Sequence, residues 1–152
     1  MLRHTVATLA YRAAKVLREA PAEFAHFRAS ETTRTPAQIL AHMGDLFDWA
    51  LGLADGRHVW RDSAPLAWED EVARFFAALE AFDRRLASGA PLGNGAGKLF
   101  SGPVADALTH TGQIAMLRRM FGSPVRSENY FKAAIAIGGV GLDQADPKVE
   151  FE

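Results

Sequence analysis

The 152-residue chain contains no cysteine. This absence excludes disulfide bonds, thiolate metal ligands and a cysteine nucleophile, and it fits a reducing compartment. No apolar run approaches the roughly 20 residues that a membrane-spanning helix needs. The formal net charge is only −1, so the composition lacks the strong positive charge typical of nucleic-acid-binding proteins. We therefore expect a cytoplasmic protein that binds neither nucleic acid nor a membrane.

Three common catalytic signatures are also missing. The segment Gly93–Lys98 resembles a phosphate-binding loop, but it has one residue too few, no serine or threonine after the lysine, and no preceding strand. The glycines at 138–141 follow an expected helix, whereas a dinucleotide-binding fingerprint follows a strand. No Gly-x-Ser-x-Gly elbow is present. We interpret both glycine-rich segments as loops.

Strand-like alternation is absent, and the apolar residues recur with helical spacing along nearly the whole chain. The predicted helices cover residues 2–29 with a break at Pro21, 35–55, about 63–88, a stretch ending at Gly122, and a short segment capped by Ser127. The predicted fold class is all-α: a four-helix bundle over residues 1–137 with a short C-terminal helix, followed by a loose polar tail over residues 138–152.

The second helix has the best-defined start. Thr35 is the predicted N-cap, Pro36 occupies the first turn, and Gln38 completes a capping box. The connection after this helix, residues 55–65, is long for a tight hairpin between antiparallel helices. A crossover along the bundle is therefore possible, and the order of the helices stays open.

A polar cluster interrupts the apolar stripe of the fourth helix. Asp106 and His110 are four residues apart and share one helical face, which continues through Gln113. A carboxylate on such a stripe needs a charge partner or a metal. His42, within the apolar arc of the second helix, is the natural third member, and two imidazoles with one carboxylate form a metal triad with open positions. The alternative is a hydrogen-bonded network or ion pair without metal.

Two further residues could support this cluster. Asp45 follows His42 by three residues, so it could reach the metal or, as we favour, orient His42 from behind. Gln113 could bond to His110 or to a substrate, or it could simply face solvent. Trp49 and Tyr130 are candidates for a pocket wall, although such aromatic residues are more often part of a core. We interpret the other histidines as structural; these are His4, His26 and His58. The pair Arg118 and Arg119 is interpreted as a solvated helix end, with the alternative that one of the two holds an anionic group of a substrate.

Two segments, ILAHMGDLFDWAL and ADALTHTGQIAMLRRMFGSPV, resemble the DinB/YfiT-like superfamily of metal-binding four-helix bundles. The resemblance covers roughly residues 1–137. Members of this superfamily usually bind a divalent metal through one histidine on the second helix and a His-x-x-x-His pair on the fourth. By this resemblance His42 is the first ligand and His110 the last. Asp106 stands where the family typically has histidine, so either it ligates the metal or the metal is lost.

The resemblance also implies a function. Characterised members include transferases and isomerases that use small thiols, many other members have no known activity and are only labelled metal-dependent hydrolases, and the family is often dimeric. We therefore expect a small-molecule substrate, possible use of a low-molecular-weight thiol, and a homodimer, which the aromatic content of the third helix mildly supports. The metal could be zinc, nickel, iron or manganese. The rival hypotheses are a non-catalytic binding or scaffold bundle and a structural metal closed by Asp45.

Overall fold

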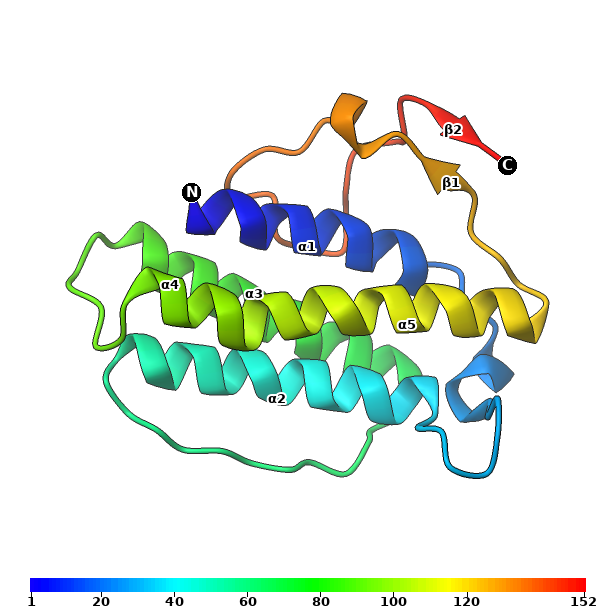
Figure 1. The fold of residues 1–152 in the computed structure, drawn as a ribbon, viewed down its shortest axis with the longest axis horizontal. Coiled ribbons are helices and arrows are strands. Elements are labelled where there is room, and N and C mark those ends of the chain that lie inside the picture. Colours follow the sequence, from blue (N-terminus) through cyan, green and yellow to red (C-terminus); the bar gives the residue numbers. More distant parts are fainter.

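The computed structural model describes residues 1–152 and is helical along most of its length (Figure 1). The helices are α1 (Leu2–Leu17), α2 (Pro36–Ala54), α3 (Trp68–Ala87), α4 (Ala96–Leu99) and α5 (Ala105–Phe121). The minor elements are 3-10 helices at Ala22–His26 and Tyr130–Lys132, a π-helical turn at Phe100–Val104, and strands β1 (Ser127–Glu128) and β2 (Glu150–Phe151). The all-α prediction is confirmed apart from these two short strands. None of the helices combines the length and apolarity needed to cross a membrane.

The four long helices form a closed arrangement. Helices α1 and α2 each pack against both α3 and α5. In Figure 1, α2 and α3 run in the same direction, opposite to α1 and α5. Two parallel neighbours cannot be joined by a tight turn, so residues 55–67, here named the crossover, return along the length of α2. The crossover that the sequence left open is therefore present.

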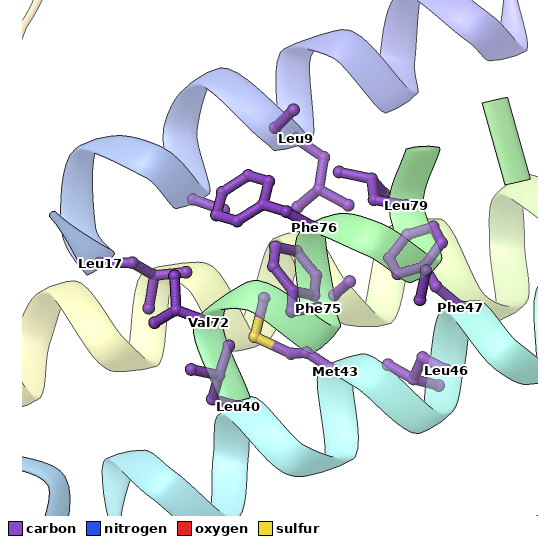
Figure 2. Close-up of a cluster of buried hydrophobic side chains, with 14 of the residues drawn as sticks. Leu9, Leu17, Leu40, Met43, Leu46, Phe47, Val72, Phe75, Phe76 and Leu79 are labelled. Carbon is purple, nitrogen blue, oxygen red and sulfur yellow. The ribbon is translucent and has the colours of Figure 1, made fainter. Parts of the chain in front are cut away.

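The core lies where the apolar stripes of the helices meet (Figure 2). Leu40, Met43 and Phe47 of α2 face Phe75 of α3, and all four side chains are fully buried. The other large aromatic side chains of α3 are buried as well. The aromatic residues of this helix therefore form the core of one chain, and they no longer support an interface with a second copy.

The start of α2 matches the predicted capping box. The hydroxyl oxygen of Thr35 accepts a hydrogen bond from the backbone N–H of Gln38 at 3.2 Å, and the Gln38 side chain accepts one from the N–H of Thr35 at 2.9 Å. Pro36 occupies the first helical position. The capping box therefore fixes both the entry of the chain into α2 and the residue before the cap, Arg34.

The break predicted near Pro21 is present: α1 ends at Leu17, and the part expected to continue to residue 29 is only a 3-10 turn at Ala22–His26. A proline disfavours helical geometry in the residue before it, so Pro21 favours an interruption of the helix before that position. Carbonyls at the end of α1 and just beyond it accept hydrogen bonds from Arg118 of α5, whose guanidinium donates to Val16, Arg18 and Glu19. The prediction of a solvated arginine pair was thus wrong for Arg118, which is only 5% exposed.

The third helix begins at Trp68, a few residues later than predicted. A buried carboxylate explains the delay. Asp45 accepts hydrogen bonds from the backbone N–H and hydroxyl of Ser63, at 2.8 and 2.7 Å, and pairs with Arg74 of α3. The backbone N–H of Leu66 donates to Glu71 at 3.0 Å. These contacts keep the end of the crossover extended and fasten it to both α2 and α3.

The fourth predicted helix is built from α4, the π-helical turn and α5 in one continuous run. Pro103 lies inside the turn and lacks the N–H that an α-helical ladder requires. The wide turn accommodates this proline, and α5 ends at Gly122 with a left-handed φ of 90° as predicted. The preceding loop is held against the end of α2, because the N–H of Gly93 donates to the carbonyl of Ala54 at 2.9 Å and the Asn94 side chain donates to that of Leu53 at 3.0 Å. The approach leaves no room for a side chain at Gly93, where a Cβ would lie 2.2 Å from the backbone nitrogen of Gly56.

The C-terminal segment departs most from expectation. Instead of a helix capped by Ser127, the structure has β1, a single 3-10 turn, and an antiparallel pairing of β1 with β2. The fully buried carboxylate of Glu128 explains the extended backbone, since it reaches the hydroxyl of Tyr11 at 2.7 Å and the ammonium of Lys15 at 3.0 Å. Glu150 also contacts Lys15, at 2.6 Å. The tail is therefore attached to α1 (Figure 1), and its description as loose was wrong.

We predict that Arg118→Leu lowers the free energy of unfolding by about 2–4 kcal/mol, because three carbonyls at the end of α1 lose their donor. Arg119→Leu is the matched control, since Arg119 is exposed and makes no ion pair. Urea unfolding followed by circular dichroism measures both. Equal losses in the two variants would contradict the role of Arg118.

We predict that Asp45→Asn destabilises the protein by about 2–4 kcal/mol at neutral pH, because Arg74 and Ser63 lose a buried charged partner. Burial alone would raise the pKa of Asp45, but the hydrogen bonds from Ser63 and Arg74 outweigh it and leave the pKa lowered. The stabilisation is therefore present above the unfolded-state pKa and is lost as the pH falls through the folded-state pKa. Urea unfolding at neutral pH and in acid should show the gap between wild type and variant shrinking in acid.

The control for this experiment is Asp48→Asn. Asp48 contacts the same guanidinium at 3.0 Å, but its side chain is 54% exposed. An exposed ion pair contributes little, so this variant should unfold almost as wild type does. A destabilisation of Asp45→Asn that persists unchanged in acid would show that its cause is not the carboxylate charge.

Candidate metal centre

The three predicted ligands come together where α2 meets α5. His42 lies in the second turn of α2, and Asp106 and His110 lie in the first two turns of α5. The apolar residues flanking them, Met43 on α2 and Ala107 and Ile114 on α5, are fully buried and hold the two helices in contact. The cluster is therefore positioned by the core of the bundle.

The donor atoms of the cluster face one another at short range. One carboxylate oxygen of Asp106 lies 3.5 Å from Nε2 of His42, and the other lies 3.4 Å from Nε2 of His110. All three ligand atoms lie within 4.8 Å of one another. The two imidazole rings pack edge to face, with their centroids 4.9 Å apart. Neither contact with Asp106 has the geometry of a hydrogen bond, so the atoms converge without bonding directly.

This spacing suits a divalent metal ion. With metal–ligand bonds of about 2.0–2.2 Å, two ligands of a tetrahedral site lie roughly 3.3–3.6 Å apart. Both contacts of Asp106 fall in that range. The two histidine nitrogens lie within 4.8 Å of each other, which is the upper limit for any pair in the cluster. The three residues can thus hold a divalent ion with little rearrangement.

Gln113 fixes the orientation of His110. Its side-chain oxygen lies 2.7 Å from Nδ1 of His110. When Nδ1 carries the proton it donates to Gln113, and the lone pair of Nε2 then points toward Asp106 and His42. Metal-binding histidines characteristically donate their other N–H in this way. The structure thus places Gln113 in contact with a predicted ligand, which is one of the roles considered for it.

His42 is held by a different environment, made of aromatic rings. Trp60 of the crossover packs edge to face on its imidazole, with the ring centroids 5.5 Å apart. Trp49 packs on Trp60 in the same way, with a centroid distance of 5.7 Å. Burial lowers the pKa of His42, and the nearby positive charge that His110 would carry lowers it further, against the opposing effect of Asp106. The neutral imidazole that results is the form that ligates metals.

The cluster is more accessible than the sequence suggested. The Asp106 side chain is 47% exposed, whereas His42 and His110 are 18% and 12% exposed. The prediction of a buried carboxylate was therefore wrong, and Asp106 does not need a metal to offset the cost of burial. Asp106 is half-exposed because it lies at the edge of the contact between α2 and α5, and helical spacing alone does not separate the edge of such a contact from its core.

Asp45 does not take part in the cluster. Its carboxylate is turned toward Ser63 and Arg74, as described above, and it makes no hydrogen bond to His42. Tyr130 is also distant from the ligands, since it packs on Tyr11 and Arg12 near the C-terminal strands. Of the two aromatic residues predicted to line a pocket, Trp49 is the one near the cluster. It packs on Trp60, which in turn packs on His42.

Sequence reasoning missed two neighbours of the cluster, Trp60 and Arg34. Trp60 contacts His42 because the crossover runs back along α2. Arg34 borders a hollow of about 380 Å³ beside His42, together with Gln38, Asp62 and Ser63. The capping box was the available signal for Arg34, because it places the preceding residue at the end of α2 nearest His42.

Comparison with models of known families, with curated proteins and with solved structures gives no match to this chain. The geometry described above is therefore the basis for a function.

Proposed function

We propose that the protein is a divalent-metal-binding helical bundle of the DinB/YfiT-like type, with His42, Asp106 and His110 as its ligands. The activity we propose is metal-dependent hydrolysis of a small molecule, or transfer to a small molecule of a low-molecular-weight thiol. The observation that carries the proposal is the convergence of three donor atoms at metal-site spacing without direct hydrogen bonds between them. The resemblance noted in the sequence supports the choice of reaction classes and of a homodimer.

The accessible side of the cluster supports a catalytic site over a structural one. Structural metal sites are usually closed by four protein ligands, whereas catalytic sites keep a position for water or substrate. Asp45 was the candidate for a fourth ligand, and it is engaged elsewhere. The half-exposed Asp106 and the hollow beside His42 leave room for a small molecule to approach.

A bound divalent ion would supply Lewis acidity and lower the pKa of a coordinating water or thiol. The residues of the chain have separate tasks around it. Gln113 holds the ring of His110, Trp60 covers the ring of His42 and limits solvent there, and the carboxylate of Asp106 contributes the negative charge that a third histidine would not. The set of two nitrogens and one oxygen is a harder ligand set than three imidazoles.

A non-catalytic bundle is the second candidate. In that case Asp106 would bridge the two imidazoles electrostatically, and its 3.4 and 3.5 Å contacts would only fix the register of α2 against α5. A buried or half-buried charge network can serve such a purpose. Metal content separates the two candidates directly.

We predict near-stoichiometric metal in the untagged wild-type protein, measured by mass spectrometry after incubation with zinc, nickel, manganese or iron(II) and removal of excess ion. His42→Ala, Asp106→Ala and His110→Ala should each lose most of it, because two ligands bind far more weakly than three. His26→Ala is the control, since His26 lies outside the cluster and should keep the wild-type content. A wild-type protein that binds none of these ions would overturn the proposed function.

We predict that Gln113→Leu weakens metal binding roughly 10- to 100-fold, because His110 loses the acceptor that fixes its ring. Gln113→Glu keeps an acceptor at the same position and should retain near wild-type affinity. Competition with a chromogenic chelator measures both affinities. Equal weakening in the two variants would show that Gln113 acts by packing and not through its oxygen.

A further inference from the structure

A second hollow borders the candidate metal centre at His110. It has a volume of about 510 Å³, within the range of small-molecule sites, and lies between the chain before α2 and the second half of α5. We name it the methionine cleft. It is lined by Ala29, Thr33, Arg34, Ile39, His110, Gln113, Met116, Leu117 and Met120. His110 and Gln113 thus border both the cleft and the cluster.

More than half of the residues that line the cleft are apolar, and two of these are largely exposed. Met116 and Met120, one turn apart on α5, are 59% and 54% exposed. Exposed methionines on a concave surface are adaptable contacts for apolar ligands, because the thioether chain is flexible and polarizable. Ile39 and Leu117 extend this apolar surface inward and join it to the core.

Arg34 is the one permanently charged residue of the cleft. Its side chain makes no ion pair and no hydrogen bond, in contrast to Arg74 and Arg118, whose guanidinium groups are engaged. Arg34 also lines the hollow beside His42, so the two hollows share this residue. An unpaired guanidinium at the end of an apolar cleft is suited to a carboxylate or a similar anion.

The wall that carries Arg34 is held in place before any ligand arrives. The backbone of Thr33 accepts a hydrogen bond from Arg28 at 2.6 Å, and its hydroxyl bonds to both backbone groups of Ser30, at 2.9 and 3.1 Å. The capping box of α2 follows directly. Binding an anion at Arg34 therefore requires ordering of one side chain and not of the loop.

We propose that the methionine cleft binds a small amphipathic monoanion, with its carboxylate at Arg34 and its apolar body along Met116 and Met120. This deepens the proposed function, on which it rests for naming the ligand a substrate, because the cleft opens beside His110. The substrate class is then an apolar carboxylic acid or a derivative that keeps its carboxylate. The binding itself depends on the cleft alone.

The test is isothermal titration of octanoate, and of octanol as its uncharged counterpart, into the full-length untagged protein stripped of metal by a chelator. The wild type should bind octanoate roughly tenfold more tightly than octanol, because the carboxylate gains a charged hydrogen bond. Arg34→Gln should abolish that preference. The double variant Met116→Gln, Met120→Gln should bind both octanoate and octanol about tenfold more weakly than the wild type.

Two matched variants control for nonspecific effects. Arg119→Gln removes an arginine of α5 that does not line the cleft, and Phe131→Gln removes an apolar side chain that is 97% exposed elsewhere. Neither should change octanoate binding. No octanoate binding by the wild type, an octanoate preference that survives Arg34→Gln, or an equal effect of the controls would overturn the inference.

Metal content, measured on the same samples before chelation, separates this inference from the proposed function. Arg34→Gln and the double methionine variant should keep the wild-type metal content, since neither changes a ligand. Octanoate binding in a protein that never takes up metal would sink the proposed function and leave the cleft as an anion site. Metal binding without octanoate binding would overturn the inference about the methionine cleft and leave the proposed metal site standing.

Discussion

The buried carboxylate of Asp45 is the constraint on which the arrangement around the site depends. Its side chain is 1% exposed, and a charge so placed must be paired and hydrogen-bonded. Its partners come from two other segments, Arg74 of α3 and Ser63 of the crossover. One charge thus joins α2, α3 and the chain between them. Without it, the crossover would lose its hydrogen bonds to α2 at Ser63 and would keep, near its end, only the bond from Leu66 to Glu71 of α3.

The candidate metal centre depends on this attachment. Trp60 lies three residues before Ser63, and it covers His42 only because the crossover is held against α2. The ring of His110 is instead oriented by Gln113, which lies on α5 like His110 itself. The two imidazoles are therefore oriented by different means, one by a side chain on its own helix and the other by a distant segment tied through Asp45.

The sequence was most informative where a pattern is local. The capping box at Thr35 and the pairing of Asp106 with His110 depend on positions three and four residues apart, and both are present. The sequence did not predict the contacts of residues whose partners are far away in the chain. Asp45 lies one turn from His42 yet bonds to Ser63 and Arg74, and Arg118 serves carbonyls of α1. Helical spacing shows which face a residue occupies, but not which remote group needs its charge.

The π-helical turn at Phe100–Val104 has a consequence for how this chain can vary in length. Such a turn contains one residue more than a turn of α-helix, so it amounts to an insertion accommodated within a continuous helix. In a regular helix, one added residue rotates everything beyond it by about 100°. Here the wide turn absorbs that rotation, and the face bearing Asp106 and His110 stays toward α2. The distance in sequence from the glycine-rich loop to the ligands is therefore free to change by a residue, whereas the spacing between the two ligands is not.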